Sequence, residues 1–277
     1  MANATLDGAR LKISRAEHHL LDLCAAINAF HNPKEDTDFI TVYPDFERKR
    51  FDFEMGEIRQ PDPAWCAVIG DIVHNLRSAL DHLVCQLAVL NGNDIDCCKS
   101  SRTSFPICLT PESFSNASRR ISPLINPDAL ALIEELQPYA AANKPTANPL
   151  QREPRFSNLW ILSELDIIDK HRTLIIAARY HGPMEFTYTI DNGAPVTIPI
   201  NAKWRPLENG AQIANIDISA LALDRQHEMH VQMQAEMKIL FYDTGCCDGL
   251  QIEDALGACF RHVSAIIDEF DGRFFGK

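Results

Sequence analysis

Residues 64–90, AWCAVIGDIVHNLRSALDHLVCQLAVL, carry the strongest helical pattern in the chain. Apolar side chains recur there about every 3.6 residues; they are Trp65, Ile69, Ile72, Leu76, Leu80, Leu83 and Leu87. Pro63 suits the first turn of a helix, and Asn91-Gly92 suits its end. The stretch therefore predicts one long amphipathic helix.

The other periodic stretches divide into helices and strands. Helical spacing predicts three more long helices, at about 6–31, 157–171 and 250–271. Alternation of apolar and polar residues between about 173 and 242 predicts the strands of an antiparallel sheet. The predicted fold class is therefore α+β, a helical bundle with an inserted antiparallel β-sheet.

The order of these elements predicts how the chain is organised. We expect a single domain over residues 1–277, because that length suits one large domain or two modest ones. The helical bundle would comprise 1–172 and 250–277, with the β-sheet insertion at 173–249. An early run near 39–59, with aromatic residues near alternation, predicts a short β-hairpin.

Composition excludes some classes of function. The net charge is −12 at pH 7, which disfavours broad DNA binding, because a nucleic-acid coat needs many Lys and Arg residues. The N-terminus has no signal-peptide pattern, and no apolar run reaches the roughly 20 residues that span a bilayer. We expect a cytoplasmic protein with no membrane partner.

The nine cysteines predict neither a disulfide framework nor a zinc site. Their number is odd, and a chain of this size does not need disulfides. The pairs Cys97-Cys98 and Cys246-Cys247 are adjacent, which is not the CxxC spacing of structural zinc ligands. We expect unpaired thiols and no cofactor.

One side of the predicted helix 64–90 is polar in an unusual way. Asp, His, Asn and Ser occupy it where a solvated helix face would carry Lys and Glu. These residue types favour specific hydrogen bonds, so another part of the chain, a second subunit or a ligand is expected to cover this side. Its members are Asp71, His74, Asn75, Ser78, Asp81, His82 and Cys85, with Arg77 at the edge.

A second polar cluster, Asp169-Lys170-His171-Arg172, closes the predicted helix 157–171. Cations near a helix C-terminus complement the helix dipole, so part of this cluster is capping. If the two helices are antiparallel neighbours, the cluster would meet the polar side of the helix 64–90.

The segments GDIVHNLRSALDHL and LDIIDKHR together resemble a widespread bacterial family of uncharacterised proteins. That family shares a GDxxHNLRSALDHL segment and a later DKHR. The resemblance covers the helical portion well and the sheet loosely. It implies no activity.

Arg77 and His82 form an R-x4-H pattern that is similar to the motif of HEPN-type helical domains. The resemblance implies a homodimer that cleaves RNA without a metal, or binds a phosphorylated ligand. His82 would be the general acid or base and Arg77 would hold the phosphate, with His74 or Asp81 orienting the imidazole. The supporting ligand-binding residues would be Asn75, Ser78, Lys170, His171 and Arg172.

Two alternatives explain the same residues. In the first, the protein is a non-enzymatic structural or interaction protein, Arg77 pairs with Asp81, and the histidines bond across helices. In the second, the bundle binds a metal through Asp71, His74 and His82, with Asp169 or His171 from the later helix.

Overall fold

The computed structural model describes residues 4–30, 40–56, 60–99, 103–141, 153–190, 194–200, 210, 212–217, 219 and 229–276. The chain divides into two units. The helical unit comprises Met1–Ala25, Pro63–Ile176 and Phe241–Lys277. The β unit comprises Ala26–Asp62 and Ala177–Leu240, so it includes the early hairpin as well as the later strands.

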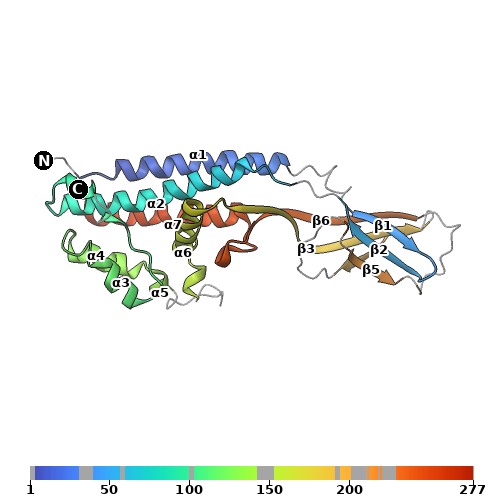
Figure 1. The fold of residues 1–277 in the computed structure, drawn as a ribbon. Helices are drawn as coiled ribbons and strands as arrows, with labels where there is room; N and C mark the ends of the chain where they lie inside the picture. The colour runs from blue at the N-terminus through green and yellow to red at the C-terminus, as the bar shows by residue number, and fades with distance from the viewer. Residues whose placement is uncertain are drawn as a thin grey trace. The chain divides into compact units, whose positions relative to one another are not determined.

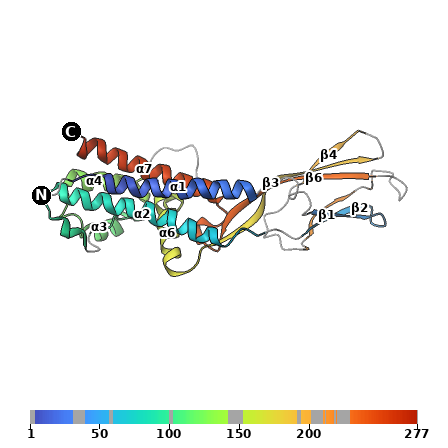
Figure 2. The ribbon, with the colours of Figure 1, turned by 90° about the horizontal axis from the view of Figure 1, so that it is seen from above.

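The predicted α+β fold with a helical bundle is confirmed. Each long helix begins and ends within two residues of its predicted bounds; the four are α1 (Asp7–Phe30), α2 (Ala64–Leu90), α6 (Asn158–His171) and α7 (Ile252–Phe270). In both views, α1, α2 and α7 run side by side in the helical unit (Figures 1 and 2). No helix in the described part of the chain is long and apolar enough to cross a membrane.

The core of the helical unit is built on α2, which packs against α6 and α7. The periodic apolar residues of α2 from Ile69 to Leu87 are buried as predicted, whereas Trp65 in the first turn is half-buried; Ile69, Ile72 and Leu76 are fully enclosed. Helix α7 contributes Leu256, Ile267 and Phe270 to the same core. Burial of each such side chain stabilises the fold by about 1.5–3 kcal/mol. The apolar contact of α2 with its neighbours therefore fixes the direction in which the polar residues of α2 point.

Three short helices lie between α2 and α6, namely α3 (Pro111–Ser118), α4 (Pro127–Glu135) and α5 (Pro138–Ala141). Helix α3 begins with a capping box, in which Thr110 Oγ1 accepts from the Ser113 amide and Ser113 Oγ accepts from the Thr110 amide. The Asn126 side chain caps α4 by accepting from the Asp128 amide. These caps satisfy N–H groups that a helix start leaves unpaired.

Single-turn helices occur elsewhere in the helical unit. They are η1 (Ile95–Lys99), η4 (Pro154–Phe156), η5 (Gly245–Cys247) and η6 (Asp271–Phe275). The first follows α2, and η5 joins the last strand to α7.

The described residues of the β unit form two three-stranded sheets. The first has the order β1-β2-β5 and is antiparallel; its strands are β1 (Ile40–Asp45), β2 (Arg50–Met55) and β5 (Gln212–Asp217). The predicted early hairpin therefore pairs with a later strand. The second has the order β4-β3-β6; its strands are β4 (Val196–Ile200), β3 (Ile175–Ile190) and β6 (Met229–Tyr242).

The expectation that every cysteine is unpaired is wrong at one place. Cys85 of α2 and Cys98 of η1 form a disulfide, with Cα atoms 5.5 Å apart. The chain turns at Asn91-Gly92 and η1 returns along α2, which brings the two residues within bonding reach. Disulfides are typical of oxidising compartments, so the bond does not favour the expected cytoplasmic location, which stays a prediction.

Candidate functional site

Arg77 and Asp81, both on α2, form hydrogen bonds to the backbone of Phe105. Arg77 Nη2 donates to the Phe105 carbonyl oxygen at 2.7 Å, and Asp81 Oδ1 accepts from the Phe105 amide at 2.8 Å. Arg77 Nη1 lies 3.0 Å from Asp81 Oδ1. Both backbone polar groups of Phe105 are thus bound by side chains of α2, and the Arg77–Asp81 pair of the structural alternative is present.

Asp81 and the Phe105 carbonyl occupy the guanidinium of Arg77, which was expected to hold a phosphate. The Arg77 side chain is 16% exposed and faces the segment 103–108. Burial raises the pKa of Asp81, and the nearby Arg77 charge and the Phe105 N–H offset only part of that rise. The pair therefore positions Phe105, and Arg77 does not present its fork to solvent.

His82 lies on a different side of α2 from Arg77. Five residues correspond to about 140° around a helix. The exposed imidazole of His82 lies against α1, where a Cβ added to Gly8 would be 2.8 Å from His82 Nδ1. The structure therefore does not combine Arg77 and His82 on one surface of α2.

Asn75 shares the α1-facing side with His82. Its Oδ1 accepts from Lys12 Nζ at 3.3 Å, and its amide donates to the Asp71 carbonyl at 2.7 Å. Asn75 is therefore buried in contacts within the bundle and is not available as a ligand-binding group.

The polar side of α2 and the end of α6 meet at Asp169, which lies against Gly70 and is influenced by Asp71 and His74. The carboxylate of Asp169 on α6 lies so close over Gly70 that a Cβ would collide with it. Burial, followed by repulsion from Asp166 and Asp71, raises the pKa of Asp169, and the exposed His74 opposes that rise. His74 Nε2 also lies 3.4 Å from Ser78 Oγ. An exposed histidine thus lies close to a carboxylate that is unusually easy to protonate.

The remaining cations of the second cluster have other partners. Lys170 Nζ donates to Asp166 at 2.6 Å, and Arg172 pairs with Asp243 at 2.9 Å. His171 is exposed and makes no hydrogen bond or ion pair within the described part of the chain. None of the three forms a hydrogen bond with Arg77 or His82 among the described residues, and their expected role in one ligand-binding site stays a prediction.

The metal alternative lacks a ligand set. Across the residues that the structure describes, no group of three or more His, Cys, Asp or Glu side chains could hold a metal ion. Asp71, His74 and Asp169 lie in one neighbourhood, but they do not form such a group.

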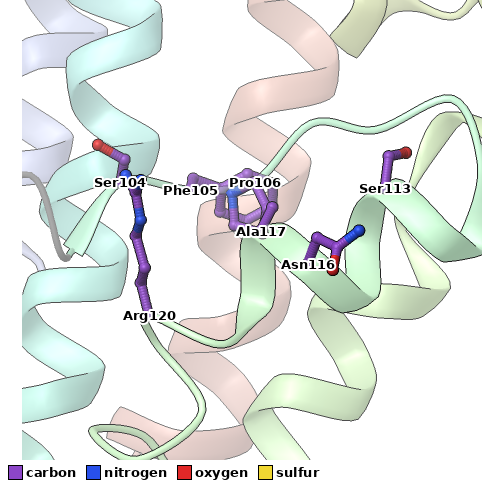
Figure 3. Close-up of a pocket in the computed structure, with 7 residues that line it drawn as sticks. All are labelled: Ser104, Phe105, Pro106, Ser113, Asn116, Ala117 and Arg120. Atoms are coloured by element: carbon purple, nitrogen blue, oxygen red, sulfur yellow. The ribbon is translucent and has the colours of Figure 1, made fainter.

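A pocket that the sequence did not reveal lies beside Phe105. Its volume is about 520 Å³. One wall is the segment Ser104, Phe105 and Pro106, and the other is α3 with the turn after it; the lining residues there are Ser113, Asn116, Ala117 and Arg120 (Figure 3). The wall that Phe105 forms is the one that Arg77 and Asp81 hold in place.

Arg120 is the cation of this pocket. It is exposed and makes no ion pair with any residue that the structure describes. Its neighbour Arg119 is exposed too but does not line the pocket. The adjacent arginines that follow α3 are the one sequence signal that could have pointed to this site, but the irregular segment 103–108 hid the other wall.

Comparisons with known protein families, with curated proteins and with solved structures give no match for this chain. The resemblances to the bacterial family and to HEPN-type domains therefore stay predictions, and the case for a function rests on the site itself.

Proposed function

We propose that this protein is a non-enzymatic binding protein that takes a small phosphorylated ligand into the pocket between Phe105 and α3. The observation that carries the proposal is the guanidinium of Arg120, which pairs with no carboxylate in the described part of the chain and lines a pocket of about 520 Å³. Arg77 and Asp81 would act as positioning residues, because they fix the opposite wall through the backbone of Phe105.

The lining suits a phosphate attached to an organic group. A guanidinium binds phosphate with two parallel hydrogen bonds, which a point charge cannot match. Ser104 and Asn116 add polar groups, while Pro106 and Ala117 supply apolar surface for a ring. Ligand sites of this size are typically apolar with a few placed polar groups. Ser113 contributes less, because its hydroxyl donates to the Thr110 carbonyl.

The test is a calorimetric titration with inorganic phosphate and the four ribonucleoside monophosphates. A charge-assisted hydrogen bond contributes about 1.5–3 kcal/mol, so Arg120→Ala is expected to weaken binding by about tenfold to a hundredfold. Arg119→Ala is the matched control and should bind as the wild type does. Equal affinity in wild type and Arg120→Ala, or no binding of any probe, would overturn the proposal.

RNA cleavage is the second candidate, and the exposed His74 beside Asp169 favours it. A histidine and a carboxylic acid of raised pKa can serve as general base and general acid at one phosphodiester. Arg77 is a weaker candidate for phosphate binding, since Asp81 and Phe105 already occupy its guanidinium.

The cleavage test uses purified protein and mixed RNA in the presence of EDTA. If the second candidate holds, His74→Ala and Asp169→Asn lose cleavage while His82→Ala keeps it. If the R-x4-H hypothesis holds, His82→Ala loses it as well. Equal cleavage by the wild type and all three variants would indicate a contaminating nuclease and exclude both.

A homodimer is a further proposal that the HEPN resemblance implies. Light scattering on the purified chain tests it, because a dimer doubles the monomer mass of 31.1 kDa.

A further inference from the structure

The loop between β6 and α7 brings two thiols together. Cys246 and Cys247 lie in η5, and their Sγ atoms are 3.7 Å apart in a hydrogen bond. Cys247 is fully buried, whereas Cys246 is half-buried and reaches the surface. The loop is tight, because Asp243 and Gly245 adopt positive φ angles of 53° and 67°. Thr244 Oγ1 closes it by donating to Asp248 at 3.1 Å.

The two thiols have opposite protonation tendencies. The hydrogen bond from Cys247 lowers the pKa of Cys246, and Arg155 adds to that effect against burial and Glu164. The same hydrogen bond, together with burial, raises the pKa of Cys247. Cys246 is therefore the thiol of the pair that loses its proton more readily, beside a Cys247 Sγ that is 3.7 Å away.

The other free cysteines whose side chains the structure describes do not share these properties. Burial raises the pKa of Cys24, Cys66, Cys108 and Cys259. The thiolate is the nucleophile in cysteine chemistry, so among these described thiols we expect Cys246 to react first with an oxidant.

We propose that Cys246 and Cys247 form a redox-active vicinal dithiol, whose substrate is a small peroxide and whose product is a disulfide between the adjacent residues. The Cys246 thiolate attacks one peroxide oxygen, breaks the O–O bond and becomes a sulfenic acid, while the other oxygen leaves and takes up a proton. The Cys247 sulfur then attacks the Cys246 sulfur. The hydroxide that is displaced takes the Cys247 proton and leaves as water.

With hydrogen peroxide, the two thiols and one peroxide thus give one disulfide and two waters. Both electrons that the sulfurs lose go to the peroxide oxygens. The short Sγ–Sγ distance places the resolving thiol beside the sulfenic acid, so the disulfide is expected to form before a second peroxide arrives.

Cys259 is the competing partner for Cys247. It is on α7, close enough to Cys247 to be one of the groups that raise the pKa of Cys247. Its thiol donates to the Asn158 carbonyl at 3.4 Å and is 1% exposed. It is therefore held away from the peroxide, so Cys246 is the expected disulfide partner of Cys247. A disulfide between Cys247 and Cys259 is the alternative that the experiment can detect.

The experiment treats the full chain with hydrogen peroxide, blocks remaining thiols with iodoacetamide after unfolding, and maps tryptic peptides by mass spectrometry. The peptide Ile239–Arg261 contains Cys246, Cys247 and Cys259. We expect it to lose two hydrogen atoms and to carry one alkyl group, on Cys259. The variant Cys259→Ala should still lose two hydrogen atoms.

Two further variants keep the proposal testable if one fails to fold. Cys246→Ser and Cys247→Ala should each lose the disulfide product, and circular dichroism shows whether each remains folded. The proposal is overturned if both Cys246 and Cys247 are alkylated after peroxide treatment of the wild type. It is also overturned if the disulfide in the peptide involves Cys259.

Discussion

Helix α2 presents two polar sides that differ in what covers them. On one side, Arg77 and Asp81 are turned to the segment 103–108 and bind both backbone groups of Phe105. On the other, Asn75 and His82 are turned to α1, and His82 stays exposed. The comparison teaches that residues of one short motif can serve different purposes, because the neighbouring segment decides what each side chain can do.

The largest loss of stability is expected from Arg77→Ala. The substitution removes the partner of Asp81 and leaves the Phe105 carbonyl without its donor, and breaking such a partly enclosed pair costs about 3–4 kcal/mol. His82→Ala should change stability by less than about 0.5 kcal/mol, because the side chain is exposed. Urea unfolding of both variants measures the difference. Equal losses would mean that the two sides of α2 are alike.

The second-largest loss of stability is expected from removing the Cys85–Cys98 disulfide, on the side of α2 that faces η1. The cross-link joins residues 13 apart, and closing a loop of that size restricts the unfolded chain. Cys98→Ser is expected to lower the free energy of unfolding by about 2–3 kcal/mol. Cys66→Ser, at a free and buried thiol, is the control for loss of a sulfur. If dithiothreitol leaves the wild-type unfolding curve unchanged, the disulfide does not form in solution.

Two glycines sharpen the comparison further. Gly70→Ala places a methyl group against the Asp169 carboxylate and should cost about 1–3 kcal/mol. Gly8→Ala places one against the exposed His82 ring, which can rotate away, and the helix gains up to about 1 kcal/mol. Thermal unfolding measures both variants. The same loss in both would show that His82 is held as tightly as Asp169.

The smallest effect is a pH dependence at Asp169. Its pKa is raised in the folded state by burial, Asp166 and Asp71, so the folded state holds this proton more tightly than the unfolded state does. Its contribution to stability is therefore present at low pH and is lost as pH rises above the ordinary carboxyl range near about 4. Asp169→Asn should be more stable than wild type at pH 7, with the difference vanishing in acid. A variant less stable at pH 7 would contradict this sign.

Much of the fold could be predicted because periodicity is local. The apolar spacing from Ile69 to Leu87 determines which side of α2 is buried, whatever covers the rest. Pro63 marks the start of that helix, and the turn at Asn91-Gly92 marks its end. The helices α1, α6 and α7 followed from the same kind of pattern.

The candidate site could be predicted only in part, because a helical wheel gives directions but not neighbours. It placed His74, Asn75, Arg77 and His82 on a polar side without showing that α1 covers one portion and Phe105 another. The pocket was missed since one of its walls, 104–106, has no periodic pattern. The Cys85–Cys98 bond was missed because it depends on the path of η1 after the turn.

The most direct test of the central claim compares Arg77→Lys with His82→Ala in the titration with phosphate and the ribonucleoside monophosphates. Lysine keeps the charge but cannot bridge Asp81 and the Phe105 carbonyl at once, so the pocket wall should shift and affinity should fall by about tenfold, or about 1.4 kcal/mol. His82→Ala should bind as the wild type does. Circular dichroism confirms that both variants are folded at the assay temperature. If His82→Ala weakens binding as much as Arg77→Lys does, the motif acts as one unit and the division of α2 into two sides is wrong.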